Sequence, residues 1–236
     1  MYNIKILENL NAKELQQIDE ALSLVVSKIL GKEQLKKLEI GEVFSIDGIA
    51  PRLMKVKDLT IQNEQYTEII SVDPLKPTSG FDSFNEFVNA PWEADHYFDE
   101  ISTNTYVNSN VDKECKRIEG LKEFKKLSSL SYSVDITPLG GKEKTTQRKI
   151  AVPSMNWIED NREFVESIFI PKIEELGVRR NGGMWLSNTR SIKSTKNAGV
   201  ALRFFDATFS AGDKTSRGIH PLMFISEDTL ITKENV

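Results

Sequence analysis

The chain begins with a helical repeat of apolar residues. These residues follow one another at spacings of three and four, which places them on one face of a helix: Leu15, Ile18, Leu22, Val25 and Ile29. Asn11 with Glu14 forms a capping-box sequence at the start, and Gly31 is a favourable stop. The apolar face could pack against its own domain, or join a short two- or three-stranded coiled coil between protomers. It covers barely two heptads, which favours its own domain slightly.

Shorter apolar runs after this helix predict strands. A basic turn is expected at 35–38, and strands at 43–46, 49–56 and 66–72. Asp47-Gly48 between the first two predicts a tight type I′ hairpin. Pro51 places the second strand at a sheet edge or a bulge, because proline donates no ladder hydrogen bond.

The middle of the chain combines a long loop with further helices and strands. Residues 73–104 predict a loop rich in aromatic side chains, which could bind a sugar or a protein but more simply form a satellite core: Phe81, Phe84, Phe87, Trp92, Tyr97 and Phe98. One helical face follows at Val111, Cys115, Ile118, Leu121, Phe124 and Leu127. Strands at 131–137 and 148–152 flank a Gly140-Gly141 turn, and a helix broken at Pro171 ends at Gly177.

The C-terminal stretch, residues 182–226, predicts strands separated by polar segments. Two glycines lead into a buried strand at 184–186, so we expect Trp185, Leu186 and Pro221 in the core. A polar loop at 187–197, a strand at 199–205, a turn at 206–216 and a strand at 218–225 follow. Helices and strands do not alternate regularly, which indicates an α+β fold. We expect a helical segment at 1–38, for oligomerisation or attachment, and one binding domain at 39–236.

Several short motifs resemble a largely uncharacterised family found in phage tail genes and bacterial surface proteins. Met184-Trp-Leu-Ser187 and Gly218-Ile-His-Pro-Leu222 resemble its Trp-Trp-Leu-Arg-Ser and final Gly-Val-Arg-Pro-Ala. Lys149-Ile-Ala-Val-Pro-Ser154 resembles its Lys-Ile-Phe-Leu-Pro-Ser, and Tyr106-Val-Asn-Ser109 its Tyr-x-x-Ser before a helix. Phe44 to Val56 resembles its opening hairpin, so the likeness spans roughly residues 40–232.

This resemblance implies a C-type-lectin-like fold of short antiparallel strands with two or more helices. The fold also serves adhesins, phage receptor-binding proteins and formylglycine-generating enzymes, so it does not select a function. Ser187 and His220 stand where the family has arginines, and a site built on those arginines is not carried over. The enzymes of this fold hold copper with paired cysteines, whereas this chain has one cysteine, Cys115, which we expect to be buried.

Composition indicates a globular protein with a local basic region. The 236 residues are 39% hydrophobic and 28% charged, with a net charge of −4, which argues against a nucleic-acid partner. The sequence has no signal peptide and no run of about 18 apolar residues for membrane insertion. Residues 172–217 hold nine Lys or Arg and four Asp or Glu, which predicts a basic face. His96 and His220 have no metal-ligand spacing, and no catalytic, metal-binding or cofactor motif is recognisable.

The motifs and the resemblance together predict a non-enzymatic phage virion component, assembled in the host cytoplasm. It would be a tail or head fibre or decoration protein that binds a bacterial surface ligand, a protein or glycan, or another virion protein. The expected ligand-binding residues lie in or beside the C-terminal loops: Arg190, Lys193, Lys196, Arg203, Arg217 and His220. The N-terminal helix would make a homo-oligomer. The alternative is an intracellular phage-encoded inhibitor or regulator that binds a host protein.

Overall fold

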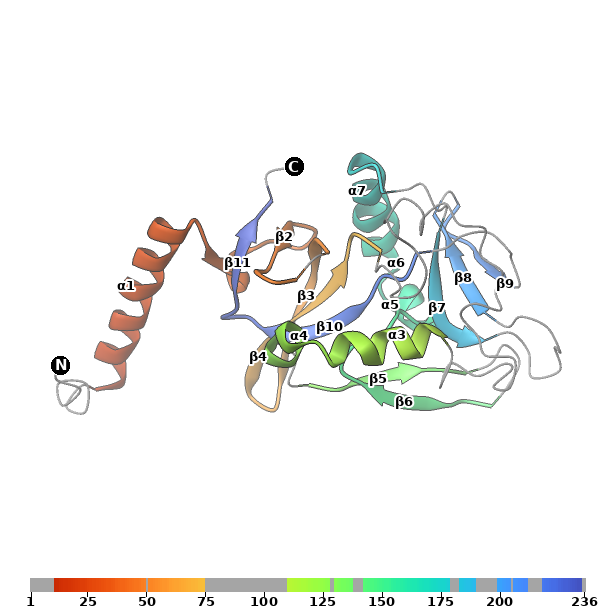
Figure 1. The fold of residues 1–236 in the computed structure, drawn as a ribbon, viewed down its shortest axis with the longest axis horizontal. Coiled ribbons are helices and arrows are strands. Elements are labelled where there is room, and N and C mark those ends of the chain that lie inside the picture. Colours follow the sequence, from red (N-terminus) through yellow and green to blue (C-terminus); the bar gives the residue numbers. More distant parts are fainter. Residues whose placement is uncertain are drawn as a thin grey trace.

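A six-stranded antiparallel sheet forms the centre of the computed structural model (Figure 1). The structure describes residues 11–49, 51–74, 110–127, 130–137, 142–178, 183–189, 199–204, 206–211 and 218–234. The sheet has the order β1-β11-β2-β3-β4-β10, with bounds β1 Glu33–Gln34, β2 Val43–Ser45, β3 Leu53–Ile61, β4 Glu64–Ser71, β10 Leu222–Ser226 and β11 Leu230–Lys233. Two smaller antiparallel sheets join β5 (Tyr132–Asp135) to β6 (Thr145–Arg148), and β7 (Gly183–Thr189) to β8 (Gly199–Arg203) and β9 (Phe209–Ala211).

Helices surround these sheets, so the expected α+β class is confirmed. Besides α1 (Ala12–Leu30) they are α3 (Asn110–Glu119), α4 (Lys122–Leu127), α5 (Met155–Asp160), α6 (Arg162–Phe164) and α7 (Ile170–Glu175). A single 3-10 turn spans Leu35–Lys37, where the sequence predicts a turn. A π-helical turn at Val165–Phe169 comes just before Pro171, which agrees with the predicted break in this helix.

The central sheet is buried on both faces. Successive residues of a strand point to opposite sides, so Leu53 and Ile69 join one hydrophobic cluster while Met54 and Ile70 join another. Side chains of α3 and α4 pack into the first cluster, and those of α5 to α7 pack into the second. Burial on both sides explains why β3 and β4 contain runs of consecutive buried residues in place of a simple alternation of buried and exposed positions.

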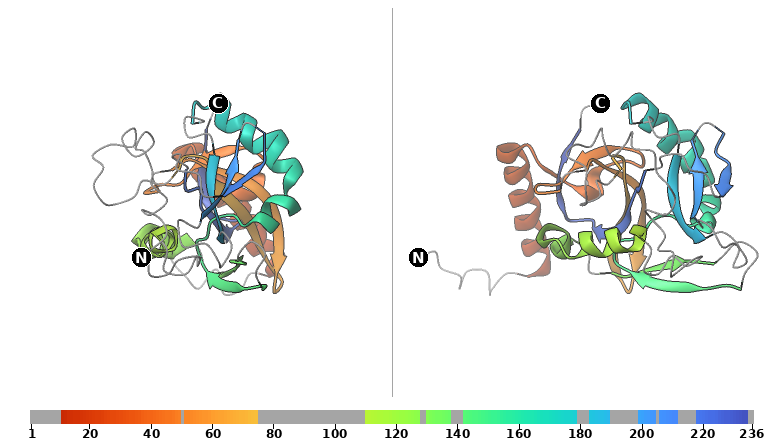
Figure 2. Two further views of the ribbon diagram at one scale, coloured as in Figure 1. Left: turned by 90° about the vertical axis from the view of Figure 1, so that its right-hand side faces the viewer. Right: turned by 45° about the vertical axis from the view of Figure 1, so that its right-hand side comes forward.

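Helix α1 lies beside the rest of the chain, which we call the body (Figure 1; Figure 2, right). Its predicted ends are confirmed: the Asn11 side chain accepts hydrogen bonds from Lys13 N and Glu14 N, both at 3.0 Å, and Gly31 has a φ of 63°. The apolar face does not pack against its own domain as expected. The exposed fractions are 43% for Leu15, 37% for Ile18, 58% for Leu22 and 50% for Val25. The side chain of Ile29 lies outside the described part of the structure.

The body begins before the expected boundary at residue 39. β1 pairs with β11, and Leu35 and Leu38 are buried in the first hydrophobic cluster. These contacts place residues 33–38 in the body, because a segment that pairs with its sheet and fills its core belongs to the same folded unit. Only α1 therefore remains as a separate helical segment among residues 11–38.

The predicted type I′ turn at Asp47-Gly48 is wrong, although β2 and β3 do form a hairpin. Val43 pairs with Met54, so the connection is longer than two residues; within it Ile49 N donates to Ile46 O at 2.9 Å. Gly48 has a φ of 81°, but Asp47 is not among the residues with positive φ, and a type I′ turn requires both. The tight turn with two positive φ values is at Gln62 and Asn63, between β3 and β4.

Candidate functional site

The C-terminal strands place only part of the expected ligand-binding set within the described structure. Arg190, Lys193, Lys196 and Arg217 lie outside the described residues, as do the aromatic residues of 81–98. Arg203 at the end of β8 is half-buried, and its Nη2 lies 2.8 Å from Asp206 Oδ2 and from Thr208 Oγ1. Arg203 thus ties together the connection between β8 and β9.

The polar loop was predicted to begin at residue 187, but β7 continues to Thr189. Ser187 and Asn188 are buried residues of β7. Ser187 Oγ donates to Asp135 O at 2.6 Å, and Asn188 Nδ2 donates to Asp135 Oδ2 at 3.2 Å and to Thr137 O at 3.1 Å. Asn188 Oδ1 accepts from Met155 N at 2.5 Å. Polar residues can therefore continue this strand because two other segments, at 135–137 and at Met155, satisfy the hydrogen bonds of their side chains.

These bonds position one side of a small pocket between β5 and α5. The β5–α5 pocket has a volume of about 190 Å³, and seven of the side chains that line it carry polar groups or aromatic rings: Tyr132, Ser133, Asp135, Ser154, Asn156, Trp157 and Asp160. Tyr132 stacks on Phe224 with ring centroids 4.2 Å apart, and Trp157 Nε1 donates to buried Glu68 Oε1 at 2.7 Å. The pocket thus joins fixed aromatic rings to two carboxylates. No local sequence pattern predicts this pocket, because its residues come from segments with no common motif.

His220 is a buried residue, so its prediction as a ligand-binding residue is wrong. It is 1% exposed, its Nδ1 lies 2.9 Å from Ser71 O, and its ring makes edge contacts with Phe169 and Phe204. Burial disfavours the charged imidazolium and lowers the pKa of His220 to about 4, although the Ser71 carbonyl and Asp73 oppose this shift. At neutral pH the ring is an uncharged part of the core, and Nδ1 is its donor to Ser71 O.

Acid should therefore destabilise the fold through His220. In the unfolded chain the imidazole has a pKa of 6.5, above the folded value of about 4, so the unfolded state binds the proton first. The full contribution of His220 to the free energy of unfolding is present above pH 6.5. It is lost as the pH falls toward 4, and the loss amounts to about 3 kcal/mol. Urea denaturation at several pH values measures this effect. As the pH falls, the free energy of unfolding should decrease more steeply in the parent than in His220→Gln. Equal slopes for the two proteins would contradict the assignment.

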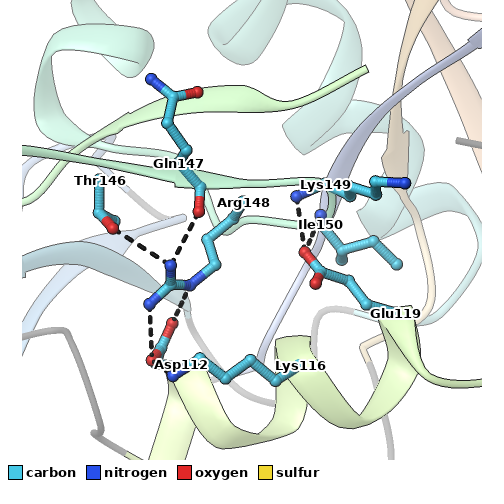
Figure 3. A network of polar contacts seen from close by, with 8 residues as sticks. All are labelled: Asp112, Lys116, Glu119, Thr146, Gln147, Arg148, Lys149 and Ile150. Carbon is cyan, nitrogen blue, oxygen red and sulfur yellow. Dashed lines mark hydrogen bonds and ion pairs between the residues drawn. The ribbon is translucent and has the colours of Figure 1, made fainter. Parts of the chain in front are cut away.

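A second buried polar network joins α3 to β6 (Figure 3). Asp112 is 0% exposed; its Oδ1 lies 2.7 Å from Arg148 Nε, and its Oδ2 lies 3.1 Å from Nη2. Lys116 Nζ is 2.8 Å from Asp112 Oδ2, and Glu119 accepts hydrogen bonds from the backbone amides of Lys149 and Ile150. These bonds fasten a helix to a strand and to the residues that follow it. No local sequence pattern predicts them, because Asp112 and Arg148, for example, are 36 residues apart.

Other expectations about sites concern metals, thiols and membranes. Cys115 is buried in the first hydrophobic cluster, as expected. Within the described ranges, no three or more His, Cys, Asp or Glu side chains gather in a way that could hold a metal ion. No described helix is both long and apolar enough to span a bilayer.

Comparison with known proteins adds no relative to this description. No protein-family model matches the chain, and neither the curated proteins nor the solved structures include a match.

Proposed function

We propose that this chain is a non-enzymatic component of a phage particle, a tail or head fibre or decoration protein, held in a homo-oligomer by α1. The observation that carries this proposal is the exposed apolar face of α1, formed by Leu15, Ile18, Leu22 and Val25. Water contact with a continuous apolar face is unfavourable, and such faces usually mark an interaction surface. Since the face is exposed to this extent beside its own body, its partner is a second molecule.

The order of residue types along this face favours a bundle of at least three helices. In heptad terms, Leu15 and Leu22 occupy the first position, and Ile18 and Val25 occupy the fourth. Leucine at the first position with β-branched isoleucine at the fourth shifts parallel coiled coils from two strands toward three or four. An assembly of this kind would present several copies of the body side by side, which suits a multivalent fibre or decoration protein.

The ionic groups of the body support a structural and binding role. The most buried carboxylates are engaged in fastening elements together: Asp112 to Arg148, and Glu68 to Trp157 and Lys57. We place contact with a bacterial surface ligand or another virion protein at the C-terminal loops, since their sequence is basic and resembles a family found in phage tails. The lectin-like fold remains part of this proposal.

Substitution of the α1 face should dissociate the oligomer. One chain has a mass of 26.8 kDa. If three or more α1 helices form a bundle, light scattering after gel filtration should give an oligomer with at least about three times this mass. Leu22→Glu places a charge on the face and should reduce that mass to one chain, while the near-UV circular dichroism of the body persists. Gln17→Glu adds the same charge to α1 outside the apolar face and serves as the control. A parent protein that is already a single chain would refute this role of α1.

The virion assignment has a separate test. Phage particles should be purified from a host whose genome carries the coding sequence. Quantitative mass spectrometry of these particles should detect the chain in a fixed copy number per particle. Its presence in the cell lysate but not in purified particles would overturn the virion role.

A further inference from the structure

We propose that the β5–α5 pocket binds a lysine or arginine side chain presented by another protein. This site goes beyond the proposed role in a particle and does not depend on α1. The juxtaposition that carries it is a pair of carboxylates, Asp135 and Asp160, beside the fixed aromatic rings of Tyr132 and Trp157.

The size of the pocket limits the ligand. Its volume of about 190 Å³ is below the roughly 300–1,000 Å³ of typical small-molecule sites. A nucleotide or an oligosaccharide does not fit within such a space, whereas one long side chain does. The ligand is therefore a single group carried by a larger molecule whose remaining surface lies outside the pocket.

The charge of the pocket selects a cation. Asp135 and Asp160 are the charged side chains that line it. Other carboxylates in this region already have cationic partners: Lys57 Nζ lies 3.1 Å from buried Glu68 Oε2, and Arg162 Nη1 and Nη2 lie 2.6 Å from Glu166 and Glu159. Within the described part of the chain, Asp135 and Asp160 have no ion pair of this kind. An ammonium or guanidinium group would supply a positive partner for these two carboxylates through charge-assisted hydrogen bonds.

The aromatic rings suit the remainder of such a side chain. Lysine and arginine bury their methylene stems along apolar surface while the charged group keeps polar contacts. Trp157 and Tyr132 line the pocket and provide such surface, and aromatic rings also attract cations. A neutral apolar side chain would lack the ionic contacts, and an acidic one would be repelled by both carboxylates.

The pocket is held in place before a ligand arrives. Asp135 Oδ1 accepts from Thr137 N at 2.9 Å, and its Oδ2 accepts from Asn188. Trp157 is fixed through Glu68, and Tyr132 through its stacking on Phe224. Binding therefore costs little side-chain entropy on this protein's side, which favours recognition of a single residue.

Tripeptides test the proposal on the full chain. Acetyl-Gly-Lys-Gly-amide and its arginine counterpart should shift the NMR signal of the Trp157 indole N–H, which the Trp157→Phe variant identifies. The Trp185 indole signal serves as an internal control, because Trp185 is buried and is not part of the pocket. The same peptide with norleucine, which has a side chain of similar length but no charge, should bind at least about tenfold more weakly.

Charge removal in the pocket gives a second comparison. Asp135→Asn and Asp160→Asn keep the side-chain shape, and each should raise the Kd of the lysine peptide about tenfold. Glu143→Gln, at an exposed residue outside the pocket, is the matched control and should leave the Kd unchanged. Equal shifts from the lysine and norleucine peptides would overturn the proposal. So would the same Kd in the parent and Asp160→Asn, or no Trp157 shift with either cationic peptide, and α1-dependent oligomerisation would be untouched by each of these results.

Discussion

Replacement of Trp185 by alanine should lower the free energy of unfolding by about 3–5 kcal/mol, which is the usual cost of truncating a large buried aromatic residue. The side chain is 1% exposed and belongs to the hydrophobic cluster that also contains Ile69 and Met223. Its backbone amide donates to Gly218 O at 2.8 Å, so the indole fills the core at a point where β7 meets the segment before β10. Removal of the ring leaves a cavity. The surrounding backbone cannot easily close it, because β7 is held in place by its hydrogen bond to Gly218.

Chemical denaturation followed by circular dichroism measures this loss directly. For a chain of this size a loss of about 3–5 kcal/mol lowers the Tm by about 10 °C. Trp185→Phe is the matched control, because it keeps an aromatic ring and should cost clearly less. An unchanged melting curve for Trp185→Ala would place the indole in solvent and contradict its position in the core.

Arg148→Ala should destabilise the protein by a similar amount, about 3–5 kcal/mol, for an electrostatic reason. Asp112 is fully buried, and Arg148, whose side chain is 14% exposed, supplies two of its hydrogen bonds (Figure 3). Removal of the guanidinium leaves the buried carboxylate with weaker compensation from Lys116, whose side chain is 43% exposed. The cost of a buried charge that has lost a partner greatly exceeds the net value of an exposed pair.

Arg162→Ala provides the control for this argument. Arg162 also contacts two carboxylates, Glu159 and Glu166, at 2.6 Å, but all three side chains are exposed. Water replaces such contacts readily, so the loss of Arg162 should destabilise the protein far less than the loss of Arg148. The double change Asp112→Leu with Arg148→Met should restore much of the stability, because it removes both buried charges. Equal losses for Arg148→Ala and Arg162→Ala would show that burial does not determine the strength of these pairs.

The elements that the sequence predicted correctly are those whose signals are local. The N-cap and stop of α1 involve residues three positions apart or next to the helix end. The strand expected at 131–137 contains β5 (Tyr132–Asp135), whereas the strand expected at 148–152 begins where β6 (Thr145–Arg148) ends. The apolar face of α1 was also predicted, but packing against its own domain was slightly favoured, whereas the face is exposed. Periodicity indicates which side of a helix avoids water, and it does not indicate which molecule covers that side.

The errors concern contacts between distant parts of the chain. His220 forms a hydrogen bond with Ser71 O, 149 residues earlier, and its ring contacts two phenylalanine rings. The polar residue can be buried because the hydrogen bond satisfies its ring nitrogen. The turn at Gln62-Asn63 was missed because it lacks the glycine that usually marks such a turn, although both residues adopt positive φ. The pocket between β5 and α5 depends on Asn188 reaching Asp135 across 53 residues. No local pattern carries that information.

The place of β11 in the central sheet has a consequence for the way the protein is made. β11 lies between β1 and β2, and Lys233 at its end pairs with Glu42, 191 residues earlier. During synthesis on the ribosome, β1 and β2 emerge early, yet the strand that joins them is translated only after the rest of the sheet. The segment that carries α1 therefore gains its sheet partner last, and contacts of such long sequence separation slow folding. Helix α1, for which we propose a role in oligomerisation, would be free to meet other nascent chains before its own body is complete.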